Sequence, residues 1–459
     1  MISALSWIRQ GVAAEEPKKQ ELDDTQYQEI MSKVNEELEQ ARLQTQHSDD
    51  EMAEDTQQED EEQEEEDSDY EGEDADAVFK DVSKLTMKDE IIGDGVDEEE
   101  EEDKEDLHVL PTDRLIVCGR TEDEVSYLDV HVYEEADDNL YVHHDLMLPT
   151  FPLCVQPINS ELAEGFKNFV AVGTFDPDIE IWNLDVLEAA FPHIILKGVK
   201  RAADKKDKKK SKSSKEEVSS SAESGGHSDA VLSLAWSATN SRLLLSASAD
   251  KSIKLWDLQS AAVVQTYVHH SDKVQSVQWC PHKPNVFAST SYDRKVVVVE
   301  MSDVDASPVK CVVLEKELPA DPEALAWDPH HPGVLAVSLE DGTVRLYSTL
   351  TASLLYTVQA HERACTSLSF NPFVPGLFLT GSVDKTIKLW SVGEDEQVKV
   401  LLERELALGK VFAASFCGDT PWLMAAAGSH AEVKVMRLMD WPVAKEFINT
   451  KLQQLAAAQ

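Results

Sequence analysis

The sequence predicts an all-β fold, a seven-bladed β-propeller in which each blade is a four-stranded antiparallel sheet. Two observations predict it. Residues 225–257 contain three strand-like runs in succession, VLSLAW, LLLSASA and SIKLW, which are separated by turn residues. The same arrangement recurs along the chain with a period in the forties, and a strand set of this size needs neighbouring copies to bury both of its faces.

The repeat is defined by residue ladders that keep the same spacing. A turn residue stands six positions before a slot for tryptophan, in the pairs Asp176/Trp182, Asp250/Trp256, Asp293/Val299, Asp341/Tyr347, Asp384/Trp390 and the degenerate His430/Met436. From Asp250 onward the steps are 43, 48, 43 and 46 residues. Nine residues before an aromatic of the preceding strand lie His227, His270 and His361. A period in the forties with Gly-His and Trp-Asp marks is the signature of WD40 repeats.

The N-terminus is predicted to begin blade one. Residues 1–14 include the strand-like run ISALSWIR, and strand-like sequence resumes only at DRLIVCGR (113–120) and LDVHVY (128–133), where Tyr133 fills the tryptophan slot. Residues 15–106 are therefore expected to be an insertion between the first and second strands of that blade. The propeller then extends over 107–447, and residues 448–459 form a C-terminal helical tail, with the short helix expected to begin near Val443.

The formal charge of −46 is unevenly distributed. Residues 15–106 hold 40 Asp/Glu against 8 Lys/Arg and are predicted to be mostly disordered. Residues 24–43 have helical spacing, which fits either a marginal helix or a docking helix for a partner groove. Ser48 and Ser68 precede carboxylates and are candidate phosphosites of an acidophilic kinase. The chain outside residues 1–106 and the basic run still carries −23, which favours basic protein partners over phosphate backbones.

A basic linker over 197–224 is expected to interrupt the propeller between blades two and three. Its first part, 197–215, carries 10 Lys/Arg against 2 Asp. The candidate nuclear import signal consists of Lys200, Arg201, Lys205, Lys206, Lys208, Lys209 and Lys210. A solvated linker is the alternative, and direct contact with RNA or DNA stays open.

The repeated polar residues are expected to be framework. We predict structural tetrads with His227, Asp250 and Trp256 in blade three, joined by Ser246 or Ser248. Blade six repeats them with His361, Asp384 and Trp390, joined by Thr380 or Ser382. Binding is then expected on a rim of turn residues, namely Lys251, Tyr292, Arg294, Lys295, Arg363 and Lys385.

The sequence contains no P-loop, no G-x-S-x-G and no C-x-x-C, so we expect no enzyme, cofactor or metal. The histidine pairs 143–144, 269–270 and 330–331 would point apart on strands, and the six cysteines fit small buried side chains. No apolar run reaches membrane-spanning length, and Met1–Ala14 lacks the pattern of a secretory signal. A monomeric, membrane-free role within protein complexes is expected.

The chain resembles the periodic tryptophan protein 1 family, a nuclear WD-repeat family. The resemblance rests on SWIRQGVA, the acidic stretch, DRLIVCGR, YVHHD, VAVGTFDPDIEIWNLDV, the lysine-rich insert and GHSDAVLSLAW. It implies a nucleolar, chromatin-associated scaffold that associates with histones and promotes ribosomal RNA gene transcription and ribosome production. The alternative is a pre-ribosome assembly factor or chaperone that binds ribosomal proteins or pre-rRNA particles. The short C-terminal tail and the loss of tryptophan from several blades depart from the family pattern.

Overall fold

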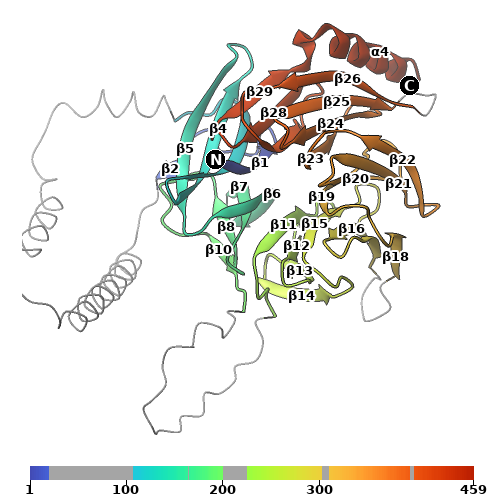
Figure 1. Cartoon of the computed structure of the whole chain (residues 1–459). Helices are drawn as coiled ribbons and strands as arrows, with labels where there is room; N and C mark the ends of the chain where they lie inside the picture. The colour runs from blue at the N-terminus through green and yellow to red at the C-terminus, as the bar shows by residue number, and fades with distance from the viewer. Residues whose placement is uncertain (20–106, 164, 200–224, 302–309, 393–396, 459) are drawn as a thin grey trace, which may run out of the picture. The chain divides into compact units, whose positions relative to one another are not determined.

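The computed structural model describes residues 1–19, 107–163, 165–199, 225–301, 310–392 and 397–458 (Figure 1). The chain divides into two units, residues 20–107 and the remainder, and the description below concerns the second of these. The predicted helix over 24–43, the phosphosites Ser48 and Ser68, and the import signal from Lys200 to Lys210 lie outside the described residues.

Seven sheets stand around a common centre, which confirms the predicted seven-bladed propeller (Figure 1). Blade one contains β1 (Ile2–Ile8), β3 (Arg114–Glu122), β4 (Val125–Glu134) and β5 (Asn139–Leu148). Blade two contains β6 (Pro152–Ala163), β7 (Phe166–Thr174), β8 (Ile179–Asn183) and β10 (Ile194–Leu196). Blade three contains β11 (Val231–Trp236), β12 (Leu243–Ser248), β13 (Ile253–Asp257) and β14 (Ala262–Tyr267). Blade four contains β15 (Val274–Trp279), β16 (Val286–Ser291), β17 (Val296–Glu300) and β18 (Lys310–Glu315).

The remaining three blades continue the same antiparallel order. Blade five contains β19 (Pro322–Trp327), β20 (Val334–Leu339), β21 (Thr343–Ser348) and β22 (Ser353–Gln359). Blade six contains β23 (Cys365–Phe370), β24 (Leu377–Ser382), β25 (Thr386–Val392) and β26 (Val398–Glu405). In blade seven the described residues form three strands, β27 (Val411–Phe416), β28 (Leu423–Gly428) and β29 (Val433–Arg437). The first strand of each blade contacts the first strand of its neighbours, and β27 closes the ring against β1.

The core lies between the blades, where in blades one to six the third strand buries the side chain at the tryptophan slot, while Met436 in the slot of blade seven is only half-buried. Trp182, Trp256, Tyr133 and Tyr347 are among the largest fully buried residues of the described chain. The tryptophan slots of the sequence repeat are thus packing positions, and Val299 fills the slot of blade four without exposure. Burial of aromatic side chains at these places supplies much of the packing between neighbouring blades.

Strand β1 pairs with β3 in antiparallel register, with Ile8 opposite Leu115. The chain between these strands leaves and returns at one place, because the Val109 N–H donates to the Glu15 carbonyl at 3.0 Å. Beside it, β2 (Lys18–Lys19) pairs in parallel with β9 (Val186–Leu187) of blade two. The two ends of the acidic segment are therefore anchored next to each other on the propeller.

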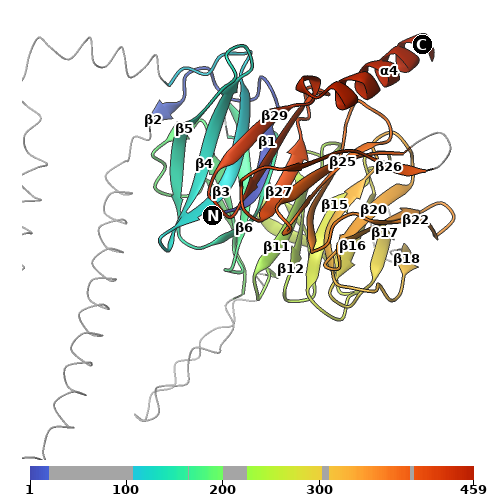
Figure 2. The ribbon, with the colours of Figure 1, turned by 45° about the horizontal axis from the view of Figure 1, so that its top comes forward.

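The C-terminal helix begins within one residue of the predicted start near Val443, and it therefore extends to the N-terminal side of the tail predicted over 448–459. A 3-10 turn, η2 (Leu438–Asp440), leads into α4 (Pro442–Ala458), which lies beside β26 (Figure 2). Proline suits the first turn of a helix, since its missing N–H would have no partner there. Ala444 and Ile448 are buried with Leu438 in the core of blades six and seven, so the start of the helix is part of the propeller rather than a free tail. No helix of the described chain is long and apolar enough to cross a membrane.

Candidate partner-binding face and its framework

The connectivity of the blades divides the propeller into two faces. In an antiparallel four-stranded meander, the turns between the second and third strands share one end with the loops between blades. We call this end the turn face and the other end the insertion face. The chain leaves the propeller for the basic linker after β10 and returns at β11, both at the turn face, whereas it leaves for the acidic segment after β1 and returns at β3, both at the insertion face. The two oppositely charged segments therefore start from opposite faces of the ring.

The tetrad of blade three is fully assembled. His227 lies 2.8 Å from the Asp250 carboxylate through Nδ1 and 2.6 Å from the Ser246 hydroxyl through Nε2, and the Trp256 indole N–H donates to the same hydroxyl at 2.7 Å. Of the two serines that the sequence analysis offered for the tetrad, Ser246 is the one that joins it. The Ser248 hydroxyl instead accepts the Asp250 N–H at 3.1 Å and closes the turn.

The electrostatics of this tetrad are those of a buried framework. Burial lowers the pKa of His227, and the attraction of Asp250 only partly offsets that effect. Burial alone would raise the pKa of Asp250, but its hydrogen bonds with His227 and Ser252 outweigh burial and the pKa is lowered. A neutral imidazole that donates to an ionised carboxylate satisfies both groups, and no polar atom of the set is left to face a substrate.

Blades six and four repeat the tetrad with variations. In blade six, His361 lies 3.0 Å from Asp384 and 2.8 Å from Thr380, and Trp390 donates to Thr380 at 2.9 Å. In blade four, His270 lies 3.1 Å from Asp293 and 2.9 Å from Ser289. Val299, in the tryptophan slot, has no side-chain N–H that could replace the indole as a donor. His269 Nε2 lies 3.0 Å from the Ser289 hydroxyl instead.

Two of the three histidine pairs do not point apart, contrary to the sequence-based expectation, whereas His330 and His331 bond to different groups, the Asn371 carbonyl and the Asp328 carboxylate. His143 and His144 have their Nδ1 atoms 2.7 Å apart, because a bulge in β5 opposite Val130 and His131 breaks the alternation of side chains. His269 and His270 lie in the loop before β15, with ring centroids 4.4 Å apart. Alternation applies only within a regular strand, which neither pair occupies.

The predicted rim residues project from the turn face because of the turn aspartates. Asp250, Asp293 and Asp384 each accept the N–H two residues on, at 2.9, 3.2 and 3.0 Å. The intervening residues Lys251, Arg294 and Lys385 adopt positive φ angles of 73°, 61° and 75° and are exposed. An Asp-capped turn of this kind fixes the backbone and directs the next side chain outward.

The basic side chains of the predicted rim differ in how far they already interact with neighbouring residues. Lys251 donates to the Ser271 carbonyl at 3.0 Å, and Lys295 and Arg294 form ion pairs with Asp293 at 3.2 Å and Asp321 at 3.0 Å. The side chains of Arg363 and Lys385 are exposed and have no hydrogen bond or ion pair with any other described residue. Blade six therefore carries the two rim cations that are available to a partner.

An acidic patch that the sequence analysis missed lies beside Tyr292. Burial raises the pKa of Tyr292 to about 12, with Glu323, Asp321 and Glu340 adding to the effect. Burial raises the pKa of Glu323 to about 7, and Glu340 and Asp321 add their charges. These acids come from the loop before β19, from β19 itself and from the turn after β20. The DPEALAW run, placed at the start of a blade, could have indicated Asp321 and Glu323, whereas Glu340 lies outside it.

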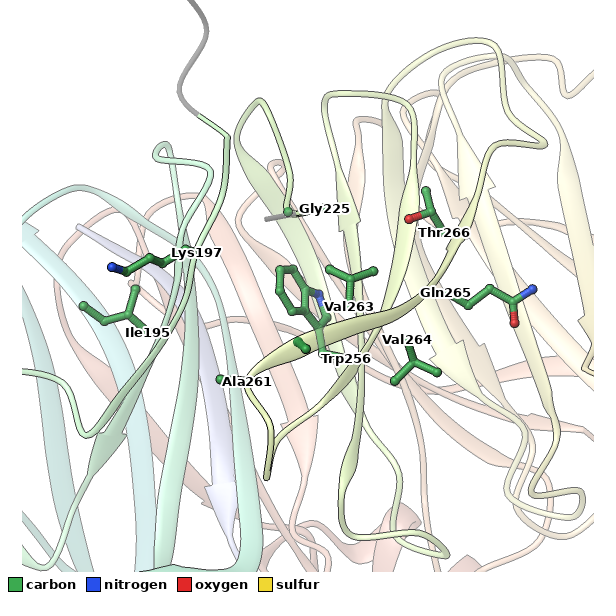
Figure 3. Close-up of a pocket in the computed structure, with 11 residues that line it drawn as sticks. Ile195, Lys197, Gly225, Trp256, Ala261, Val263, Val264, Gln265 and Thr266 are labelled. Carbon is green, nitrogen blue, oxygen red and sulfur yellow. The ribbon is translucent and has the colours of Figure 1, made fainter. Parts of the chain in front are cut away.

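A surface hollow of about 650 Å³ lies between the outer strands of blades two and three (Figure 3). Ile195 and Lys197 border it on the side of blade two, and Gly225, Trp256 and the stretch 261–266 of β14 and its turn border it on the side of blade three. Its lining is polar and apolar in similar measure, with Lys197, Gln265 and Thr266 as the polar side chains apart from Trp256, whose indole N–H is already bonded to Ser246. The hollow offers contact surface rather than acid–base chemistry.

Comparison with known proteins places the fold in a class. The WD domain, G-beta repeat model matches residues 219–257, 261–299 and 352–391. A chain in the crystal structure of the mitotic checkpoint complex superposes with a TM-score of 0.51 at 18% identity, over 72% of this chain and 84% of that one. The protein is a WD40-repeat β-propeller.

Similar sequences then define its family. Periodic tryptophan protein 1 of Saccharomyces cerevisiae is 29% identical over 96% of this chain and 88% of its own. An uncharacterized WD repeat-containing protein of Schizosaccharomyces pombe is 34% identical over 95% of this chain and 88% of its own. A more distant relative is histone acetyltransferase type B subunit 2 of Debaryomyces hansenii, 24% identical over 49% of this chain and 58% of its own. The chain belongs to the periodic tryptophan protein 1 family.

Proposed function

We propose that this protein is a non-enzymatic nuclear and nucleolar scaffold that associates with chromatin through histones. In that role it promotes ribosomal RNA gene transcription and ribosome production. Membership in the periodic tryptophan protein 1 family supports the link to ribosome production, as the family resemblance implies. The saturated tetrads support a scaffold, because the most chemically suggestive residues of the chain are bonded to one another.

The observation that carries the proposal is the anchored acidic segment. Residues 15–106 hold 40 Asp/Glu against 8 Lys/Arg, and their two ends are joined to a rigid ring at Glu15 and Val109. A dense negative charge attracts Lys/Arg-rich proteins and speeds their association. Histone tails have that composition, and a subunit of a histone acetyltransferase is among the relatives. The exposed Arg363 and Lys385 lie on the turn face, away from the face where the acidic segment starts.

Affinity purification from nuclease-treated nuclear extract tests the proposal. The intact chain is compared with a variant in which a short Gly-Ser linker replaces 20–106, which the 3.0 Å bond between Glu15 and Val109 makes feasible. We expect histones and polymerase I factors with the intact chain and their loss from the variant. Recovery of ribosomal proteins and pre-rRNA without histones would contradict the proposal and support the assembly-factor alternative.

The nuclear location is tested separately on the basic linker. Alanine at Lys205, Lys206, Lys208, Lys209 and Lys210 is expected to leave a fluorescently tagged chain in the cytoplasm. Val199 donates its N–H to the His227 carbonyl at 2.6 Å, so the linker ends are fixed to the propeller and the change spares the fold. Unchanged nuclear fluorescence in the alanine variant would show that these lysines are not an import signal.

A further inference from the structure

Three side chains that bind transition metals meet inside blade one. Cys118 of β3 lies directly opposite Asp129 of β4, and His131, two residues further along β4, shares the same face of the sheet. All three are buried, and one ligand atom from each lies within 4.8 Å of the others. The Cys118 sulfur is 3.8 Å from His131 Nδ1.

The distance between the sulfur and nitrogen ligands fits tetrahedral coordination. Bond lengths of about 2.3 Å for zinc–sulfur and about 2.0–2.1 Å for zinc–nitrogen place a sulfur and a nitrogen ligand roughly 3.6 Å apart. The 3.8 Å separation of Cys118 Sγ and His131 Nδ1 is close to that value. A thiolate, an imidazole and a carboxylate are the donor types that zinc selects, whereas calcium and magnesium prefer oxygen alone.

Asp129 provides the independent observation. Its Oδ2 accepts the Arg120 Nε–H at 2.6 Å, but its Oδ1 is buried and has no hydrogen-bond partner among the described residues. The side chain is only 2% exposed, and a buried carboxylate oxygen without a partner is costly. A cation beside Cys118 and His131 would supply what this oxygen lacks.

Arg120 has the position of an orienting neighbour of a metal ligand. Its guanidinium holds Asp129 from one side, is fixed by Glu122 at 2.6 Å and lies 4.7 Å from the Tyr127 ring centroid. Metal-bound carboxylates are commonly held by such hydrogen bonds, which fix their orientation. The guanidinium also offsets part of the negative charge that a thiolate and a carboxylate bring into a buried place.

We propose that Cys118, Asp129 and His131 form a structural zinc site, with water in the fourth position. Cys118 packs with Ile2 of β1 and Ala427 of β28, so the site lies where blade one meets blade seven. That seam closes the ring without a shared strand, since β1 and β28 belong to different sheets. The Cys118 thiol releases its proton to solvent on binding, and the ion strengthens the seam.

Cobalt(II) titration of the full chain tests the site, because only a thiolate ligand gives a sulfur-to-cobalt charge-transfer band in the near ultraviolet. The acidic segment can bind cobalt through carboxylates but cannot produce that band. We expect the band to saturate at one cobalt per chain, to disappear when zinc is added, and to be absent from Cys118→Ser and His131→Gln. Cys365→Ser, another buried strand cysteine, is the matched control and should keep it.

Thermal melting of the unmodified chain provides a second measurement if the variants fail to fold. Excess zinc should raise the melting temperature by a few degrees over the chelator-treated protein, about the effect of a ligand bound only to the folded state. The absence of the band in the unmodified chain would overturn the proposal, and so would a band that persists in Cys118→Ser. The Arg120–Asp129 ion pair would then only stabilise blade one, as the His–Asp tetrads stabilise blades three and six.

Discussion

At the scale of single residues, the tetrads decide what the repeated histidines and aspartates do. His227 contacts both Asp250 and Ser246, and Trp256 donates to the same serine, so each member satisfies the others in a buried place. Removing one member leaves a buried polar group without its partner, which costs about 1–3 kcal/mol. Blade five lacks this arrangement, since buried Leu318 stands in the histidine position.

The pair Asp250→Ala and Asp341→Ala tests this difference. The Asp250 carboxylate bonds to His227 and Ser252, whereas within the described residues the carboxylate of exposed Asp341 bonds only to Thr343 of its own turn, at 2.6 and 2.9 Å. We expect urea denaturation to show a loss of about 1–3 kcal/mol for Asp250→Ala and a smaller loss for Asp341→Ala. Equal losses for the two variants would mean that the histidine contributes nothing to the network.

The buried histidines also predict a pH dependence. Burial lowers the pKa of His269 to about 4 and of His144 to about 3, with the neighbouring histidine of each pair adding to the effect. An unfolded histidine has a pKa of about 6.5, so below that pH the unfolded chain binds protons that the folded chain does not. The free energy of unfolding should therefore fall as the pH drops from about 6.5 toward about 4.

Urea denaturation at several pH values across that window measures the effect. His269→Gln keeps a hydrogen-bonding side chain near Ser289 but cannot titrate, so it should reduce the slope of stability against pH. A slope that is the same in the variant and the unmodified chain would show that His269 does not remain neutral in the folded state.

At the scale of elements, β1 closes the ring although a long segment separates it from the rest of its blade. It pairs with β3 and contacts both β6 and β27, so it takes part in the packing of three blades. Ile2 and Ile8 are each only 1% exposed. The N-terminal strand is thus the innermost strand of blade one and part of the propeller core, rather than an extension of the acidic segment.

Deletion of residues 1–12 should abolish the cooperative unfolding transition and make the propeller sensitive to protease. The physical reason is that the inner edge of β3 and the facing surfaces of β6 and β27 would become exposed. Removal of 453–459, which includes the exposed residues 453–457 of α4, is the control and should change neither property. Protection in the 1–12 deletion equal to that of the control would refute the role of β1.

The elements also show how far the sequence was informative. The residue ladders predicted seven blades, because each slot is a packing position that recurs once per sheet. The close pairs His143/His144 and Cys118/His131 could not be predicted, since both depend on a bulge or on strand pairing that no single stretch encodes. The start of α4 was predicted to within one residue, but the burial of Ala444 against blades six and seven was not, because it is a tertiary effect.

At the scale of the whole molecule, charge and topology act together. The acidic segment starts from the insertion face and the basic linker from the turn face, where Arg363 and Lys385 are also exposed. A rigid ring between them holds the two attachment points apart. We infer that the two segments serve different partners, basic proteins for the first and the import machinery for the second.

Direct binding of purified histones H3–H4 to the purified chain tests the central claim most directly. The intact chain is compared with variants lacking 20–106 or 200–224, after all three have been shown to melt alike. We expect the first deletion to weaken binding about tenfold or more and to reduce its salt dependence, and the second to leave affinity unchanged or higher. Equal affinity of the intact chain and the variant lacking 20–106 would contradict the account.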